Sequence, residues 1–177
     1  MSDALLVRDA RDSDMPTVQA IYAEHVLTGI ASFELEPPTL EELLRRRADV
    51  LSNALPYLVA ELNGEVVGYG YATLYRPRPA YSNTVEDSVY VRDGMGGRGI
   101  GQALLAEVIE RCIVNGRRQM VAVIGNSENA GSIALHTRMG FRLVGVFESV
   151  GFKHGRWVDT VLMQRRLGEG AETLPDA

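Results

Sequence analysis

Hydrophobic and polar positions along the chain follow the two periods that are typical of strands and helices. Alternating or continuous apolar runs predict seven strands, at residues 4–8, 57–62, 65–75, 84–91, 119–124, 141–152 and 156–167. Apolar residues at helical spacing predict four helices, at residues 14–27, 39–50, 102–114 and 129–139. This order, β-α-α-β-β-β-α-β-α-β-β, mixes hairpins with one crossover unit. We therefore expect an α+β (mixed α/β) sheet with helices on both faces.

Local signals mark where several of these elements begin and end. Ser13 is a candidate N-cap for the first helix, and residues 39–42 have the pattern of a capping box for the second. Asn63-Gly64 predicts a two-residue hairpin turn. No repeat or long linker divides the chain, so we expect one domain over residues 1–167. The polar, acidic segment 168–177 is expected to be a frayed tail.

Composition narrows the class of protein. A chain of 177 residues that is 46% hydrophobic is long enough for one full core. Its net charge of −5 argues against nucleic acid as a partner. The single cysteine, Cys112, excludes an internal disulfide and fits a reducing compartment. Residues 1–4 lack the pattern of a signal peptide, and no apolar run has membrane-spanning length. We therefore expect a cytoplasmic protein with no membrane partner.

The stretch from residue 84 to residue 109 carries the strongest chemical signal. An apolar strand ends at Val91, a glycine-rich loop follows at residues 94–101, and a helix begins at once. The first turn of a helix has free backbone N–H groups and the positive end of the helix dipole, which together attract an anion. Glycine lets the backbone approach a phosphate closely, because it has no Cβ. The segment therefore predicts a site for a phosphorylated cofactor.

Two glycine fingerprints overlap in this loop. Gly94-x-Gly96-x-x-Gly99 matches a dinucleotide pattern, but the following strand ends at Gly125 without the required acidic residue. The second fingerprint, Gly96-x-x-Gly99-x-Gly101, resembles the pyrophosphate loop of the GNAT superfamily of N-acetyltransferases, Gln/Arg-x-x-Gly-x-Gly/Ala. Gly96 stands where that pattern has Gln or Arg. Arg98 can still offer a charge to the phosphates of coenzyme A.

Further segments carry the same resemblance. Residues 129–141, Asn-x-x-Ser-x-x-Leu-His-x-x-x-Gly-Phe, are similar to the superfamily's Asn-x-x-Ala/Ser-x-x-Leu-Tyr-x-x-x-Gly-Phe, with His136 at the Tyr position. Residues 31–38, the strand 84–91 and residues 151–159 resemble the phosphinothricin N-acetyltransferases. These motifs lie in register and cover residues 5–167.

The resemblance implies a fold and an activity. The fold is a GNAT-like, twisted, mostly antiparallel sheet of about seven strands, flanked by about four helices. The activity is acetyl transfer from acetyl-CoA, by direct attack in a ternary complex, to the α-amine of a small glutamate-like analogue. Phosphinothricin, methionine sulfoximine and methionine sulfone are the implied acceptors, in a detoxification role that includes herbicide resistance. A homodimer is implied as well, and no metal is expected.

Two residues are candidates for the chemistry. Glu86 falls on the family's proposed catalytic glutamate, although an ordinary glutamate, with a pKa of about 4.3, needs burial or an intervening water to deprotonate an amine. An ion pair with an arginine is its alternative, structural role. His136 is the candidate acid or relay, because the pKa of histidine is near neutrality. Its alternative role is a contact with the helix dipole or with the core.

The remaining candidate residues divide into two groups. The coenzyme group comprises Ser88, Val89, Tyr90, Val91, Gly96, Gly97, Arg98, Gly99, Ile100, Gly101, Asn129 and His136. The acceptor group comprises Phe33, Tyr75, Arg76, Val85, Glu86 and Asp87, with Glu34, Lys153 and His154 as further candidates that a dimer interface could bring in.

Three alternatives stay open at this point. The acceptor could be a protein N-terminus or a polyamine, although arginines before the strand argue against a polyamine. The chain could also be a non-catalytic module that senses acetyl-CoA. The only sequence feature in favour of this alternative is Gly96, which replaces the Gln or Arg of the loop pattern. The third alternative is a dinucleotide-dependent enzyme.

Overall fold

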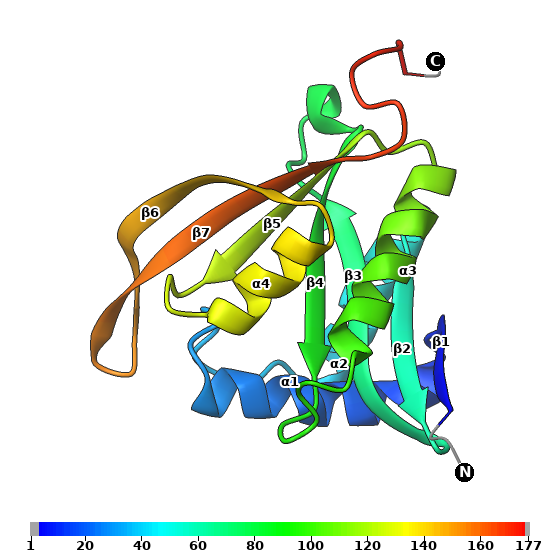
Figure 1. The fold of residues 1–177 in the computed structure, drawn as a ribbon. Helices are drawn as coiled ribbons and strands as arrows, with labels where there is room; N and C mark the ends of the chain where they lie inside the picture. Colours follow the sequence, from blue (N-terminus) through cyan, green and yellow to red (C-terminus); the bar gives the residue numbers. More distant parts are fainter. Residues whose placement is uncertain (1–3, 176–177) are drawn as a thin grey trace.

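The computed structural model of the protein describes residues 4–175. Its seven strands form one sheet in the order β1-β2-β3-β4-β5-β7-β6 (Figure 1). The strands are β1 (Leu5–Asp9), β2 (Tyr57–Leu62), β3 (Glu65–Leu74), β4 (Thr84–Val91), β5 (Gln119–Gly125), β6 (Arg142–Lys153) and β7 (Arg156–Arg166). The helices are α1 (Met15–Thr28), α2 (Leu40–Ser52), α3 (Ile100–Val114) and α4 (Ala130–Arg138), with short 3-10 turns at Asp12–Asp14 and Pro79–Tyr81.

The sheet is antiparallel throughout except for one pair. Strands β4 and β5 run parallel, and α3 makes the crossover between them. The predicted mixed, mostly antiparallel sheet is therefore confirmed. Asn63 and Gly64 have φ values of 53° and 84°, so both adopt the left-handed conformation that a type I′ hairpin turn requires.

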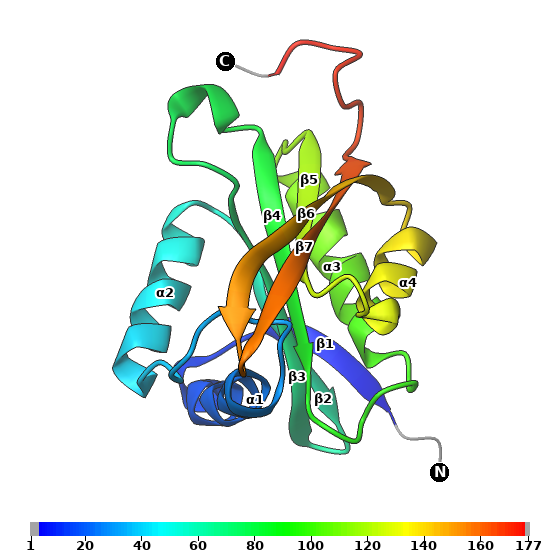
Figure 2. The ribbon, with the colours of Figure 1, turned by 90° about the vertical axis from the view of Figure 1, so that its left-hand side faces the viewer.

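Helices cover both faces of the sheet. Helices α3 and α4 lie on one face, and α1 and α2 lie on the other (Figures 1 and 2). Helix α3 buries Leu104, Leu105 and Val108 completely against the sheet. The hairpin of β6 and β7 extends away from this packed body, as Figure 1 shows. The two-sided arrangement expected from the sequence is thus present.

The starts of the first and third helices differ from the sequence-based prediction. Ser13 lies within a 3-10 turn, and α1 begins at Met15. The carboxylate of Asp14 organises this corner instead, because it accepts the backbone N–H of Arg11 at 2.7 Å and pairs with Arg8 at 2.8 Å. Helix α3 begins two residues earlier than predicted, directly after the glycine loop.

The second helix uses one half of its predicted capping box. Thr39 Oγ1 accepts the backbone N–H of Glu42 at 3.2 Å. The carboxylate of Glu42 accepts from Arg45 and Arg46 instead of reaching back to the cap. Competition from two nearby guanidinium groups explains the difference, because charge-assisted hydrogen bonds are stronger than neutral ones.

The C-terminal segment folds back onto the domain. Residues 168–173 form turns and bends, and the Arg118 guanidinium donates to Thr173 Oγ1 at 2.8 Å and to the Leu174 carbonyl at 3.0 Å. Residues 176–177 of the predicted tail lie outside the described residues. Within residues 4–175 no helix is long and apolar enough to cross a membrane.

Candidate active site

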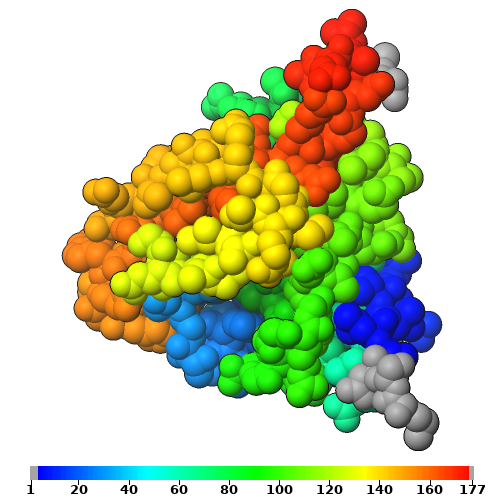
Figure 3. Space-filling model, in the orientation of Figure 1, coloured from blue at the N-terminus to red at the C-terminus, as the bar shows by residue number. Residues whose placement is uncertain are grey.

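The centre of the molecule is a place where two neighbouring strands part. Strands β4 and β5 are paired only from Thr84↔Gln119 to Glu86↔Val121, and they diverge beyond that point. The space between them, here called the strand cleft, has a volume of about 70 Å³. It is lined by Ala31, Asp87, Ser88, Val89, Tyr90, Ala122, Val123, Ile124, Gly125, Asn129, Ser132 and His136. Figure 3 shows this face of the molecule hollowed where the blue, green and yellow segments meet.

The glycine loop leads from the end of β4 into α3. Gly97 and Gly99 both have φ values of 77°, a left-handed conformation that favours glycine over other residues. No side chain caps the first turn of α3. Backbone N–H groups at this helix start are therefore free to bind an anion. A Cβ built on Gly96 meets no atom within 4 Å, so this position has room for the larger side chain that the loop pattern normally carries.

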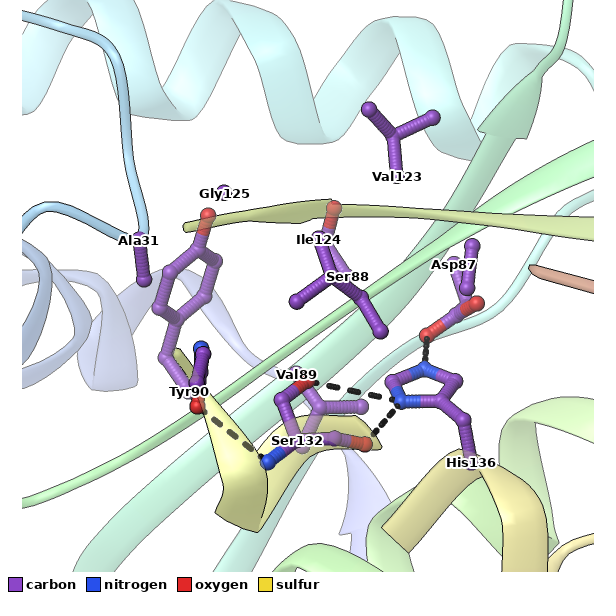
Figure 4. Close-up of a pocket in the computed structure, with 12 residues that line it drawn as sticks. Ala31, Asp87, Ser88, Val89, Tyr90, Val123, Ile124, Gly125, Ser132 and His136 are labelled. Carbon is purple, nitrogen blue, oxygen red and sulfur yellow. Dashed lines mark hydrogen bonds and ion pairs between the residues drawn. The ribbon is translucent and has the colours of Figure 1, made fainter. Parts of the chain in front are cut away.

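A buried ion pair closes one end of the strand cleft (Figure 4). The ring of His136 donates from Nδ1 to the Ser132 carbonyl at 2.7 Å, and its Nε2 lies 2.9 Å from Asp87 Oδ2. Burial lowers the pKa of His136, but the hydrogen bond and charge of Asp87 outweigh it and raise the pKa above its ordinary value. Both ring nitrogens are engaged within the protein. The structure thus brings His136 to the cleft wall without leaving a free ring N–H to face a ligand.

The cleft fits a ligand that carries hydrogen-bond donors. Asp87 Oδ1 is buried and has no hydrogen-bond partner among the described residues. Asn129 is the N-cap of α4, and its Oδ1 accepts the Ser132 N–H at 3.2 Å, which leaves its amide nitrogen for other partners. Unused backbone donors at one end and an unpaired carboxylate oxygen at the other suit a long arm with a phosphate group and amide groups.

A second cavity opens on the other face of β4. This acceptor pocket has a volume of about 470 Å³ and is lined by Tyr22, Ala31, Ser32, Phe33, Glu34, Glu86, Ser88, Tyr90, Val123, Gly125 and Thr160. Glu86 faces it because side chains alternate along a strand, which directs Asp87 to the opposite side. Burial and the neighbouring charge of Asp87 raise the pKa of Glu86, while Arg76 partly offsets them. A carboxylate shifted in this direction is better suited to accept a proton from an amine.

A polar network fixes the loop that forms one wall of the acceptor pocket. The Tyr22 hydroxyl donates to the Glu34 carboxylate and lies 2.8 Å from Ser32 Oγ. Arg46 pairs with Glu34 at 2.7 Å. Burial opposes ionisation of Glu34, but Arg46 and Tyr22 outweigh it and lower its pKa. On the far side Lys153 Nζ, from the end of β6, donates to the Ser32 carbonyl at 2.7 Å. The loop is therefore held from two directions.

Comparisons with known proteins agree with this geometry. A family model described as an acetyltransferase (GNAT) domain matches residues 7–162. The chain belongs to the GNAT acetyltransferase family. It is 53% identical to a phosphinothricin N-acetyltransferase of Alcaligenes faecalis, covering 98% of this chain and 88% of the relative. It is 42% identical to an L-methionine sulfoximine/L-methionine sulfone acetyltransferase of Pseudomonas aeruginosa, covering 91% and 94%.

A solved structure adds the coenzyme. The GNAT superfamily phosphinothricin acetyltransferase of Sinorhizobium meliloti, in complex with AcCoA, superposes with a TM-score of 0.94 at 47% identity, covering 97% of this chain and 93% of that one. The protein is thus an acyltransferase of the GNAT fold that uses acetyl-CoA, and the predictions of fold, enzyme class and coenzyme are confirmed.

The residues predicted for the coenzyme fall into three places in this GNAT domain. Ser88, Val89, Tyr90, Asn129 and His136 line the strand cleft, and Val91 extends β4 beyond it. Exposed loop positions follow at Gly96, Gly97, Arg98 and Gly99. Ile100 and Gly101 are the first two residues of α3, and the side chain of Ile100 is buried.

The residues predicted for the acceptor are more scattered. Phe33, Glu34 and Glu86 line the acceptor pocket together. Arg76 stacks over the ring of Tyr75, with 5.0 Å from guanidinium carbon to ring centroid, at the opposite end of β4 from the glycine loop. Val85 is fully buried in the core, and Asp87 points to the strand cleft, so neither lines the acceptor pocket.

Sequence reasoning did not single out several lining residues. Tyr22 and Thr160 lie far from the glycine loop in the sequence and reach the acceptor pocket only through the fold. Gly125 had a signal of its own, at the end of a strand. A Cβ there would lie 2.5 Å from the Ala31 carbonyl oxygen, so a larger residue would displace the pocket loop.

Proposed function

We propose that this enzyme acetylates the α-amine of a small, glutamate-like amino acid analogue, and that Glu86 is its general base. The observation that carries the proposal is the position of Glu86. It lies where β4 separates the strand cleft from the acceptor pocket, so an amine at its carboxylate stands beside the cleft. The relatives that act on phosphinothricin and on methionine sulfoximine or sulfone support this acceptor class.

Acetyl-CoA supplies an acetyl group as a thioester, whose carbonyl carbon accepts the amine while the carbon–sulfur bond breaks. An ammonium has no lone pair, so the acceptor must first lose a proton. Glu86 is the carboxylate of the acceptor pocket whose pKa burial raises, whereas the pKa of Glu34 is lowered, and Glu86 takes that proton directly or through a water. The oxyanion is stabilised by backbone N–H groups of β4 near Val89, Tyr90 or Val91, on the strand edge that β5 has left unpaired.

The leaving sulfur needs little acid help, because a thiol has a pKa near 8.5 and departs readily as a thiolate. His136 was the candidate acid, and its two nitrogens are already hydrogen-bonded. We propose that the pair of Asp87 and His136 holds α4 against β4 and lines the site of the thioester. Donation from His136 would require the exchange of one of these bonds. Arg76 is proposed to bind the acceptor carboxylate, since its charge acts on Glu86 and an arginine can grip a carboxylate through two donors.

We also propose a homodimer that works in the cytoplasm in detoxification, herbicide resistance included. Support for the dimer comes from the β6–β7 hairpin, whose exposed apolar residues are Leu143, Val144, Val146, Phe147, Val150, Phe152 and Trp157. Strand β6 is also an edge of the sheet, and a long apolar edge is prone to pair with another chain. Light scattering after size-exclusion chromatography should give twice the monomer mass for the wild type. The Phe147→Asp variant should give the mass of a single monomer.

An amine panel tests the proposed function. The purified protein, acetyl-CoA and a thiol reagent are mixed with phosphinothricin, methionine sulfoximine, methionine sulfone, ordinary amino acids, spermidine and N-terminal peptides. Thiol release with the first three compounds, at the highest kcat/KM, is the expected result. Release with peptides or spermidine alone would reject this acceptor class. A thermal shift with coenzyme A but no release with any amine would indicate a sensor instead of an enzyme.

A further inference from the structure

A third cavity lies beside Glu86 and has no role in the function described so far. This distal pocket has a volume of about 270 Å³ and is lined by Tyr75, Tyr81, Thr84, Gln119, Val121, Val144, Leu162, Met163 and Gln164. Four of these residues, Val121, Val144, Leu162 and Met163, are apolar. The polar groups among its lining residues come from two glutamines, two tyrosines and a threonine.

The distal pocket and the acceptor pocket share one face of the sheet. Thr84, which lines the distal pocket, and Glu86, which lines the acceptor pocket, are two residues apart on β4. Val121 and Val123 stand in the same relation on β5. Residues two apart on a strand point to the same side, so the pockets are neighbouring parts of one surface with Glu86 at their border.

The two glutamines form a relay with a fixed direction. The Arg142 guanidinium donates to Gln164 Oε1 at 2.9 Å, and Gln164 Nε2 donates to Gln119 Oε1 at 3.0 Å. A guanidinium can only donate, so it determines which end of the Gln164 amide is the oxygen. That in turn determines the amide of Gln119. The Nε2 group of Gln119, with two N–H donors, is consequently the end that is left for the distal pocket.

The register places this donor at a useful separation from the base. Glu86 is paired with Val121, and Gln119 is two residues before it on β5. From strand spacing and rise, the Cα atoms of Glu86 and Gln119 are roughly 8 Å apart. An amino acid of glutamate size, with its amine at Glu86, would extend its side chain towards Gln119.

We propose that the distal pocket binds the acceptor side chain, and that the Gln119 amide donates a hydrogen bond to an oxygen on its end. This proposal rests on the proposed function and specifies which acceptor side chains the enzyme prefers. The preferred acceptor has an apolar stem and a terminal oxygen that accepts hydrogen bonds, such as a sulfone, sulfoximine or phosphinate. A thioether of the same length fits the apolar wall but offers Gln119 no oxygen.

Methionine sulfone and methionine form the matched pair that tests this, because they differ only in two oxygens on sulfur. The quantity measured is the ratio of kcat/KM for the sulfone to kcat/KM for methionine. Gln119→Leu should lower this ratio about tenfold, the usual order for one lost hydrogen bond. The KM for acetyl-CoA should stay unchanged. The ratio compares two acceptors on one preparation, so partial loss of folded protein cancels.

Gln164→Glu tests the relay with almost no change in shape. A carboxylate only accepts, so it would receive both Arg142 and Gln119 Nε2, and Gln119 Oε1 would turn to the pocket. The sulfone-to-methionine ratio should therefore fall in this variant as well. Val144→Ala is the control, because it removes pocket wall without touching the relay, and both acceptors should be affected alike.

The outcomes separate the two proposals. If the wild-type enzyme acetylates neither compound nor any other amino acid analogue, the proposed function fails. If the wild type acetylates the sulfone and the ratio is unchanged in Gln119→Leu, the distal-pocket proposal is overturned while the function stands. A ratio that falls in Gln119→Leu but not in Gln164→Glu would overturn the relay.

Discussion

The strand cleft and the acceptor pocket share a wall but are built in different ways. The cleft takes its lining mainly from three short runs, at residues 87–90, 122–125 and 129–136. The acceptor pocket collects side chains from α1, the loop after it, β4, β5 and β7. Coenzyme binding therefore depends largely on local backbone conformation, whereas acceptor binding depends on how distant segments pack.

This difference explains what each side can recognise. Backbone N–H groups at a helix start and glycines with positive φ bind a phosphate whatever the rest of the ligand is. Selectivity for one amine needs side chains held at defined positions, and here Tyr22, Glu34, Arg46 and Lys153 hold the wall. Changes in the two regions should accordingly affect different kinetic constants.

Among the substitutions on the acceptor side, Glu86→Gln should reduce catalysis the most. Removal of the base should lower kcat by about 100-fold or more, because general base catalysis contributes on the order of 10² to 10⁴. The KM for acetyl-CoA should change little, and Glu41→Gln, on the exposed start of α2, is the control. Since the pKa of Glu86 is raised, wild-type kcat/KM should rise with pH along a limb above the ordinary glutamate range. Unchanged turnover in Glu86→Gln would remove this residue from the mechanism.

Coenzyme binding should be weakened most clearly by a substitution at Gly99. Its φ of 77° is costly for any residue with a Cβ, by roughly 1–2 kcal/mol, so Gly99→Ala should raise the KM for acetyl-CoA about tenfold. The acceptor KM should stay close to wild type. Gly96→Ala is the matched control, because this glycine has open space and no positive φ. Equal effects of the two substitutions on the coenzyme KM would contradict a backbone-based phosphate site.

The same contrast decides how much the sequence could predict. Apolar periodicity and the Asn63-Gly64 turn gave the order and type of all seven strands and four helices, because each signal is local. The glycine loop was readable for the same reason. Ser13 was the wrong cap, since the Asp14 carboxylate is held by Arg8 and by the Arg11 N–H.

The acceptor pocket was less predictable because its contacts are long-range. Val85 and Asp87 were predicted for the acceptor together with Glu86, yet the alternation of β4 sends them to the other face. Lys153 meets Ser32 across 121 residues of chain, a contact that no local pattern encodes. Side-chain selectivity is thus the part of the function that needed the fold.

Lys153→Met should affect acceptor binding more than coenzyme binding, with a smaller effect than the two substitutions above. The buried ammonium of Lys153 holds the pocket loop through the Ser32 carbonyl, so its loss should raise the acceptor KM several-fold. The KM for acetyl-CoA and kcat at saturation should change less. Arg45→Met, which removes a long exposed cation from α2, should leave both constants unchanged. A rise confined to the coenzyme KM would show that this anchor serves the cleft instead.

The smallest effect concerns the buried pair in the strand cleft. The pKa of His136 is raised in the folded protein, so the pair stabilises the fold fully below the unfolded pKa of about 6.5. This stabilisation is lost as pH rises through the folded pKa. The wild-type Tm should therefore decline by a few degrees as the pH rises from the unfolded pKa of His136 through its folded pKa. A change of 1 kcal/mol corresponds to about 2–4 °C for a chain of this size. His136→Gln should remove the decline, whereas His154→Asn, in the exposed β6–β7 turn, should retain it. The same slope in all three proteins would mean that His136 does not carry the charge that the geometry gives it.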